Sequence, residues 1–211
     1  MKILIAIPSM DEVPSQFAHS LATLRKVEEC AVTFQIGSLI YTSRDELAKK
    51  SIEMEADYIF WLDSDMVFAP DTLEKLFKNR DKGDILTGLY FRRVQPYSPV
   101  LFDKMEIDDE GCHWTDFKEI PDEPFEVGGC GFGCVLMPTN IFLDVLTKYG
   151  AMFSPIASVG EDLSFCWRAR QCGYRIVCDP SVQLGHVGKY VITKEFFDVY
   201  NKSKNSQNQQ G

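Results

Sequence analysis

The sequence lacks a long apolar run. No stretch approaches the roughly 20 residues that a membrane-spanning helix needs. The apolar segment after Met1 and Lys2 ends at Pro8, which is too short for the apolar region of a secretory leader. We therefore expect a cytoplasmic protein with no integral membrane segment.

Basic residues are in the minority. Lysine and arginine total 22 against 31 aspartate and glutamate residues, which gives a net charge of −9. This acidic balance argues against a nucleic-acid partner, although it allows a local basic site for phosphate. The 211 residues, 45% hydrophobic and 25% charged, suit a single globular domain.

Three common motifs are also missing. The seven cysteines are odd in number and scattered, which is typical of reduced thiols in a cytosolic protein. Cys130 and Cys134 lie close together, but no second Cys or His pair stands at zinc-ribbon spacing. The glycines of residues 128–133 precede an apolar strand instead of opening a helix, and no Gly-Lys-Ser/Thr follows them. This excludes both a Rossmann fingerprint and a P-loop.

What the sequence contains is an alternation of strands and helices. Apolar runs predict strands at 3–7, 32–36, 58–62 and 85–90. Helical patterns lie between them, beginning at Pro14, at a Ser43–Glu46 capping box and at Pro70. After the glycines we expect an apolar strand, helices at 138–149 and from Gly160, a last strand at 174–178 and a short helix from Thr193. This order predicts an α/β fold with a mostly parallel central sheet and helices on both faces.

Two segments depart from this pattern. Residues 103–126 are dense in Asp and Glu and have no clear period, which favours a solvated excursion over the alternative of a mobile substrate lid. Residues 201–211 are polar, and we expect them to form a disordered tail.

The strand at 58–62 ends in two carboxylates, in the sequence Asp63-Ser64-Asp65. Open α/β sheets bind ligands outside the carboxyl ends of their strands, so these acids are expected at a ligand site. Two oxygen donors suit Mg²⁺ or Mn²⁺, and such a cation suits phosphate. The alternative is structural, since Asp residues also form turns and cap helices.

Further motifs extend this pattern into a resemblance. Asp63-Ser64-Asp65, the glycine-rich strand, Gly160-Glu161-Asp162 at a helix start and His186 follow one another, and Arg44 precedes them. In this order they resemble the GT-A fold glycosyltransferases, and particularly glycosyltransferase family 2, over nearly all of residues 1–192. The resemblance implies the GT-A (nucleotide-diphospho-sugar transferase) fold in one domain, 1–200, with a nucleotide-binding half (1–92) and an acceptor-side half (93–200).

The resemblance also implies roles for individual residues. Asp63, Asp65 and His186 match the family's metal site, where Mn²⁺ or Mg²⁺ neutralises the leaving diphosphate as a Lewis acid. Asp162 matches the general base of inverting members, and a neighbouring Glu161 would raise the pKa of one of the two acids. The structural alternative is that both acids only stabilise the helix dipole.

The donor and acceptor segments follow in the same way. The nucleotide-sugar donor, with UDP favoured, would contact Pro8, Met10, Asp11 or Glu12, Arg44 and Ser64 together with the two aspartates. Residues 128–133 match the acceptor-facing segment, with Trp114 or Phe132 as stacking surfaces.

The sequence thus indicates a metal-dependent glycosyltransferase that moves a sugar from a nucleoside-diphosphate sugar to a hydroxyl of a glycan or other acceptor. Alternatives are a non-catalytic nucleotide-sugar or glycan-binding domain, and a sugar nucleotidyltransferase, which the acidic loop after the first strand disfavours. The motifs leave open the sugar, the donor base, the acceptor, the oligomeric state and the choice between inversion and retention.

Overall fold

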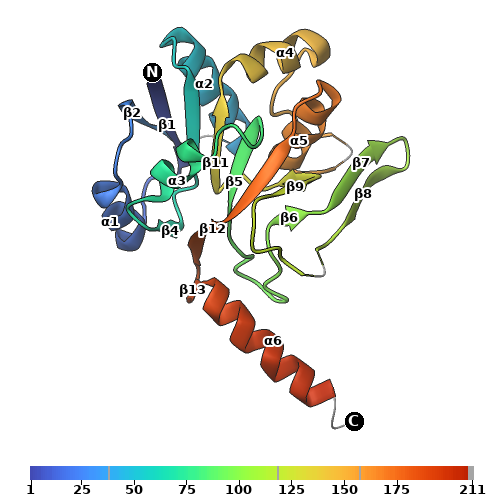
Figure 1. Ribbon diagram of the computed structural model, residues 1–211. Helices are drawn as coiled ribbons and strands as arrows, with labels where there is room; N and C mark the ends of the chain where they lie inside the picture. The colour runs from blue at the N-terminus through green and yellow to red at the C-terminus, as the bar shows by residue number, and fades with distance from the viewer. Residues whose placement is uncertain (38, 118, 157, 209–211) are drawn as a thin grey trace.

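The computed structural model describes residues 1–208 except 38, 118 and 157. Its central sheet has the strand order β13-β12-β5-β11-β3-β1-β2 (Figure 1). The β1–β2, β1–β3 and β5–β12 pairs are parallel, whereas β11 runs antiparallel to both of its neighbours. The α/β fold with a mostly parallel sheet is therefore confirmed. The strands of this path are β1 (Lys2–Ser9), β2 (Glu29–Ile36), β3 (Tyr58–Leu62), β5 (Ile85–Leu89), β11 (Cys134–Pro138), β12 (Ile176–Val187) and β13 (Val191–Ile192).

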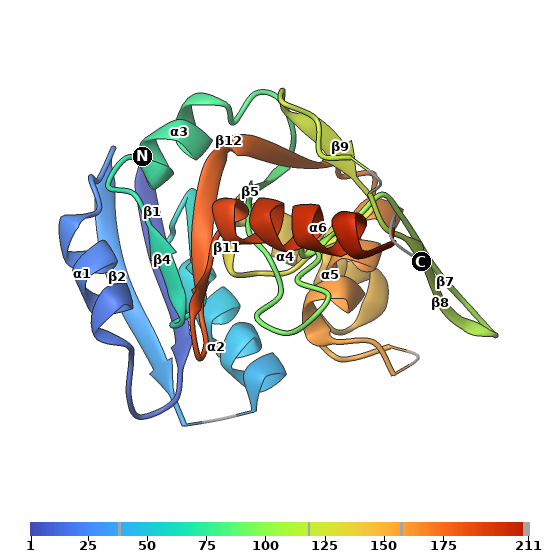
Figure 2. The same ribbon diagram turned by 90° about the horizontal axis from the view of Figure 1, so that it is seen from below.

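Helices cover both faces of the sheet, and each face has its own apolar cluster (Figure 2). On one face, α1 (Ser15–Thr23) and α3 (Thr72–Lys78) pack against alternate residues of β1 and β3. On the other face lie α2 (Ile40–Glu53), α4 (Asn140–Tyr149) and α5 (Glu161–Gln171). Because side chains alternate between the faces of a strand, a strand buried on both sides needs the continuous apolar run seen in the sequence.

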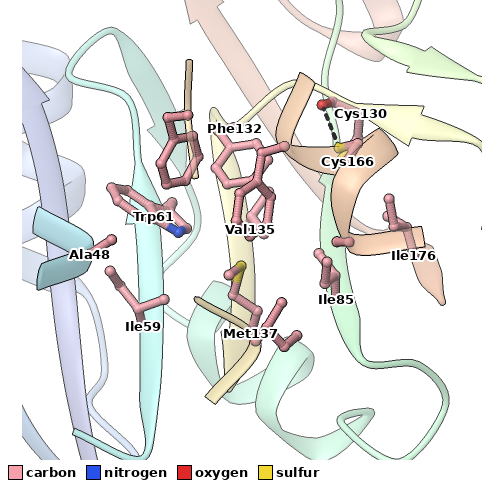
Figure 3. Packing of buried hydrophobic residues seen from close by; sticks show 14 of the residues in the cluster. Ala48, Ile59, Trp61, Ile85, Cys130, Phe132, Val135, Met137, Cys166 and Ile176 are labelled. Atoms are coloured by element: carbon pink, nitrogen blue, oxygen red, sulfur yellow. Dashed lines mark hydrogen bonds between the residues drawn. The ribbon is translucent and has the colours of Figure 1, made fainter. Parts of the chain in front are cut away.

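Aromatic rings fill the cluster beneath α2, α4 and α5. The rings of Trp61 and Phe132 lie 5.9 Å apart (Figure 3). The Phe153 ring contacts both. Phe132 is 1% exposed, so it is a core residue and not the acceptor-stacking surface that the sequence suggested. The Phe132 prediction is therefore wrong. The glycines around Phe132 suggested an open segment, and the sequence does not show that its spatial neighbours bury it.

One predicted helix start is wrong, and one segment has more structure than predicted. Helix α2 begins at Ile40, and the Ser43 amide already donates to the Leu39 carbonyl, so the Ser43–Glu46 pair lies inside the helix instead of capping it. Residues 103–126 are largely exposed, as the predicted solvated excursion requires, but they contain strands that the sequence did not predict. They contain β7 (Lys104–Asp108) and β8 (Gly111–Thr115), which pair as a hairpin that projects from the body, and they lead into β9 (Phe125–Val127). Met105 of the hairpin is fully buried and fixes it to the core.

Strand β12 is longer than predicted, and this brings the site together. It continues past Pro180 through a shift in register between Asp179 and Gln183. His186 therefore lies within β12, not after the last strand. An unpredicted strand, β4 (Met66–Phe68), pairs with this extension and sets Met66 opposite His186. The residue before Met66 is Asp65, so the pairing places the second aspartate beside the histidine.

The glycine-rich segment forms β10 (Gly129–Cys130), which pairs with β6 (Leu101–Phe102). The chain ends in α6 (Lys194–Asn208), which extends away from the sheet (Figure 1). The tail predicted as disordered from residue 201 is helical up to Asn208, since apolar contacts of its first turns nucleate a helix that the following residues continue. Residues 209–211 lie outside the described residues. No helix within the described ranges has both the length and the apolar character needed to cross a membrane.

Candidate active site at the ends of β3, β5 and β12

Side chains from the ends of three strands, β3, β5 and β12, meet at one edge of the sheet. Asp63 follows β3, the segment 90–93 follows β5, and His186 lies near the end of β12. The apolar runs of β3 and β5 are buried and give way to polar residues within a few positions of the strand end, and β12 itself carries polar residues along its length. This leaves carboxylate, imidazole and guanidinium groups together at the carboxyl edge of the sheet, where open α/β sheets hold ligands.

Asp65 and His186 form the centre of this group. The Asp65 Oδ2 atom lies 3.3 Å from His186 Nε2, and His186 Nδ1 lies 2.9 Å from the Phe91 carbonyl oxygen. Because a carbonyl only accepts hydrogen bonds, Nδ1 carries the proton and donates it to Phe91. In neutral imidazole the Nε2 lone pair then points at a carboxylate oxygen. The two atoms attract each other only when a proton on Nε2 or a bound cation lies between them; with that proton, His186 donates a hydrogen bond to Asp65 and carries a positive charge.

Arg93 supplies positive charge to the same carboxylate. Its Nη1 atom lies 2.7 Å from Asp65 Oδ2 and 3.4 Å from the Val187 carbonyl oxygen. Burial acts to raise the pKa of Asp65, but the hydrogen bond and charge of His186 and the charge of Arg93 outweigh it and hold the pKa below its ordinary value.

Arg44 of α2 forms salt bridges with two other acids, Asp63 and Glu161. Its Nη2 atom lies 2.8 Å from Asp63 Oδ1, and its Nε atom lies 3.0 Å from Glu161 Oε1. The side chain is 2% exposed, and its guanidinium lies over the rings of Trp61 and Phe132. Burial works against its charge, but the carboxylates of Asp63 and Glu161 more than offset this and raise the pKa of Arg44. Arg44 thus orients both acids. It is too deep to reach a ligand as an exposed residue would.

Asp162 occupies the first turn of α5, beside Glu161. Burial, reinforced by the charge of Glu161, raises the pKa of Asp162 to about 6, although Arg44 and the Leu163 amide oppose the shift. Asp162 lines a cavity of about 370 Å³ together with Asp63, Asp65 and His186, which we call the Asp162 cavity. A carboxylate of this pKa is ionised at neutral pH and can still accept a proton.

A second cavity, of about 320 Å³, borders the same two aspartates and the end of β1, and we call it the β1 cavity. It shares Asp63, Asp65 and Arg93 with the Asp162 cavity. Of the residues predicted for a donor, Pro8, Met10, Ser64 and both aspartates line it, with Ile40 and Ser43 from the start of α2. Asp11 and Glu12 are exposed and are not among its lining residues. The structure therefore does not bring these two acids to the site.

The predicted metal ligands are only partly assembled. Within the described ranges, no three His, Cys, Asp or Glu side chains lie together as a metal-binding group. Asp65 and His186 converge, whereas Asp63 is bonded to Arg44. The pair nevertheless fits a cation, because an oxygen and an imidazole nitrogen face each other and the Phe91 carbonyl fixes the histidine tautomer.

The glycine-rich segment has a structural reason for its glycines. A Cβ on Gly131 would lie 2.1 Å from the Tyr90 hydroxyl oxygen, and a Cβ on Gly133 would lie 2.8 Å from Tyr90 Cζ. The Gly133 amide also donates to that hydroxyl at 3.1 Å. Residues 128–133 are buried and pack against the protein's own chain, which corrects the prediction that they face an acceptor. Trp114 of β8 is 50% exposed and rests edge-on against Phe102.

Sequence analysis missed Arg93 and Tyr90. Tyr90 is the last residue of the predicted strand 85–90, and Arg93 comes three residues after it. The rule that singled out the aspartates after 58–62 therefore applies equally to the segment at the end of β5. Tyr90 lines the Asp162 cavity with Arg92 and Arg93. The signal was the Arg92-Arg93 pair at a strand end in an acidic chain.

No family model matches the sequence. Two solved structures similar to the chain each have a TM-score of 0.63. A crystal structure of A197 from STIV is 22% identical and matches over 89% of this chain and 86% of its own. A crystal structure of GalNAc-T7 with UDP, GalNAc and Mn²⁺ is 12% identical and matches over 89% of this chain, which covers 44% of GalNAc-T7. Both have the GT-A fold, and so does this protein.

Proposed function

We propose that the protein is a metal-dependent glycosyltransferase, of the kind found in glycosyltransferase family 2, that moves a sugar from a nucleoside-diphosphate sugar to an acceptor hydroxyl. The observation that carries the proposal is the Asp162 cavity. In this cavity Asp162, whose pKa is about 6, lines the wall together with Asp65 and His186. The GT-A fold, and the UDP and Mn²⁺ bound to GalNAc-T7, support it.

Asp65 and His186 are the proposed ligands of Mn²⁺ or Mg²⁺. When bound, the metal would neutralise the charge that develops on the leaving diphosphate. Asp63, which forms a salt bridge with Arg44, would orient the donor. The β1 cavity is the proposed donor site, with Met10 and Ile40 as apolar walls for the base and Ser64 nearby. UDP is the favoured nucleotide.

Asp162 is the proposed general base, which would take the proton of the acceptor hydroxyl as that oxygen attacks the anomeric carbon with inversion. Glu161 would raise the pKa of this base, and Arg44 would hold Glu161 in place. The acceptor would then lie in the Asp162 cavity and the donor in the β1 cavity, with Asp63 and Asp65 lining both.

Thermal unfolding with UDP, GDP, CDP and ADP, each with and without Mn²⁺, tests the donor site. A ligand at 100 times its Kd stabilises by about 2.7 kcal/mol, and a chain of this size gains roughly 2–4 °C in Tm per kcal/mol. We expect a Mn²⁺-dependent rise of several degrees with UDP. It should be absent in Asp65→Ala and retained in Asp81→Ala, an exposed acid outside the site. No rise with any nucleotide would refute the donor site.

A non-catalytic nucleotide-sugar-binding domain is the second candidate. The Arg93–Asp65 contact favours it, because an internal cation on Asp65 suits a protein that binds diphosphate without turnover. Incubation with UDP-sugars and Mn²⁺ separates the two functions. Release of UDP above the Asp162→Asn background indicates an enzyme, whereas nucleotide binding without release indicates a binding domain.

A further inference from the structure

Arg93 lies where three cavities meet. It lines the β1 cavity, the Asp162 cavity and a third cavity of about 490 Å³, whose other lining residues include Val94, Tyr97 and Tyr190. It belongs to the segment that follows β5 and lies at the carboxyl edge of the sheet. A residue in this position can reach groups bound on either side of Asp65.

The contacts of Arg93 place its charge on the proposed metal ligand. Arg93 Nη1 and His186 Nε2 both approach the same Asp65 oxygen, at 2.7 and 3.3 Å. A cation that binds Asp65 through this oxygen must therefore share or replace the hydrogen bond from Arg93. The contact is open to such an exchange, because the Arg93 side chain is 52% exposed and exposed ion pairs are weak.

The neighbouring residues leave Arg93 room to move without moving the fold. Phe91 is buried on one side of it. On the other side, Tyr97 packs edge-on against Phe196 and Tyr200 of α6. The intervening residues 93–96 are exposed. The segment is thus fixed at both ends and free to change side-chain position between them.

We propose that Arg93 is the internal counter-cation of Asp65, that it yields this place to the metal, and that it then binds the diphosphate of the donor. The inference rests on the proposed function. Arg93 borders the β1 cavity, and a guanidinium is suited to phosphate because its planar fork donates two parallel hydrogen bonds. Metal binding at Asp65 would thereby prepare the diphosphate site.

Two binding measurements on Arg93→Ala test this exchange, and neither needs turnover. The free-ion EPR signal reports Mn²⁺ binding without nucleotide, and calorimetry reports UDP binding at saturating Mn²⁺. Loss of a competing surface ion pair should tighten Mn²⁺ binding by about two- to fivefold. Loss of charged hydrogen bonds to phosphate should weaken UDP binding by about tenfold or more. The opposite signs distinguish an exchanging residue from one that merely stabilises the site.

Two further variants serve as controls. Arg92→Ala removes the same charge from the adjacent residue, whose guanidinium lies over Phe102, and should alter Mn²⁺ binding much less. Arg93→Lys keeps the charge without the fork and should stay near wild type for Mn²⁺ while losing UDP affinity. If Arg93→Ala leaves Mn²⁺ binding unchanged or weaker, or leaves UDP binding unchanged, the inference is wrong while the proposed function stands. If the wild-type protein binds neither Mn²⁺ nor UDP, both are wrong.

Discussion

Asp162 carries a stability cost that its proposed role explains. Its ordinary pKa of 3.8 rises to about 6 in the folded protein. Between these values the folded state binds more protons than the unfolded state, so Asp162 lowers stability as pH rises through this range. The full cost above pH 6 is about 2 to 3 kcal/mol, from 1.36 kcal/mol per pKa unit.

Asp162→Asn should therefore make the protein more stable and less active. We expect a gain of up to about 2 kcal/mol in urea unfolding at pH 7.5, which vanishes near pH 4 because wild-type Asp162 is then protonated. Transfer should fall by about 10²-fold or more. Glu161→Gln, which weakens the bond to Arg44, is the matched control and should not stabilise. Equal stability of Asp162→Asn and wild type at pH 7.5 would contradict the buried charge.

The same group predicts the acid limb of the rate profile. Protonated Asp162 cannot accept the acceptor's proton, so kcat/KM should fall about tenfold per pH unit below pH 6. The residual activity of Asp162→Asn should lack this limb. Measurement at saturating Mn²⁺ from pH 4.5 to 8 checks it, and a wild-type profile that stays flat down to pH 5 would assign the base elsewhere.

At the scale of elements, the Tyr90 side chain leaves no room for a Cβ atom at Gly131 or Gly133, so this segment needs glycine. Gly131→Ala would set a Cβ 2.1 Å from the Tyr90 hydroxyl and 2.7 Å from Val100 Cγ1. Overpacking of this kind costs typically about 1–3 kcal/mol. Urea unfolding should show this loss. The Tyr90→Phe/Gly131→Ala double variant should recover part of it, because the nearest clashing atom is gone. If the double variant loses as much stability as the two single variants combined, the hydroxyl contact is unimportant.

The elements themselves were mostly predictable, and the exceptions have physical causes. Strands β1 and β3 are buried on both faces, so their apolar runs identify them directly. The extension of β12 past Pro180 was not predictable, because it depends on a register shift and on pairing with β4, a strand of three residues. The β7–β8 hairpin was missed because its apolar face consists of only Met105 and Ile107 of β7 and their partners Trp114 and Cys112 of β8, within an acidic segment.

At the scale of the whole molecule, the site depends on contacts between distant parts of the chain. Asp65 meets His186 across 121 residues, and Arg44 meets Glu161 across 117. Motif order could nominate these residues individually. It could not show that Arg44 is buried beneath the acids, or that Arg93 bonds Asp65, since local pattern does not encode which side chains pair. Asp11 and Glu12 are residues that the motif order nominated but that do not line the cavity, because a matching sequence position does not fix where a side chain lies.

Helix α6 extends this dependence to the end of the chain. Phe197 stacks on Phe91 at 4.6 Å, next to the segment that carries Arg93, whereas Val199 on the same helix is 63% exposed. Phe197→Ala should lower stability by about 1–2 kcal/mol, because the ring is only partly buried and a full core truncation costs about 3–5. The Tm should fall by roughly 2–8 °C. Val199→Ala should change it little.

Phe197→Ala should also weaken UDP binding at saturating Mn²⁺, although Phe197 is not among the residues that line the cavities around Arg93. The Phe91 carbonyl holds His186, and Tyr97 anchors the segment of Arg93 to α6, so a loosened helix disturbs both groups. Calorimetry below the Tm of each variant separates this effect from unfolding. If Phe197→Ala lowers Tm but binds UDP as Val199→Ala does, α6 stabilises the fold without organising the site.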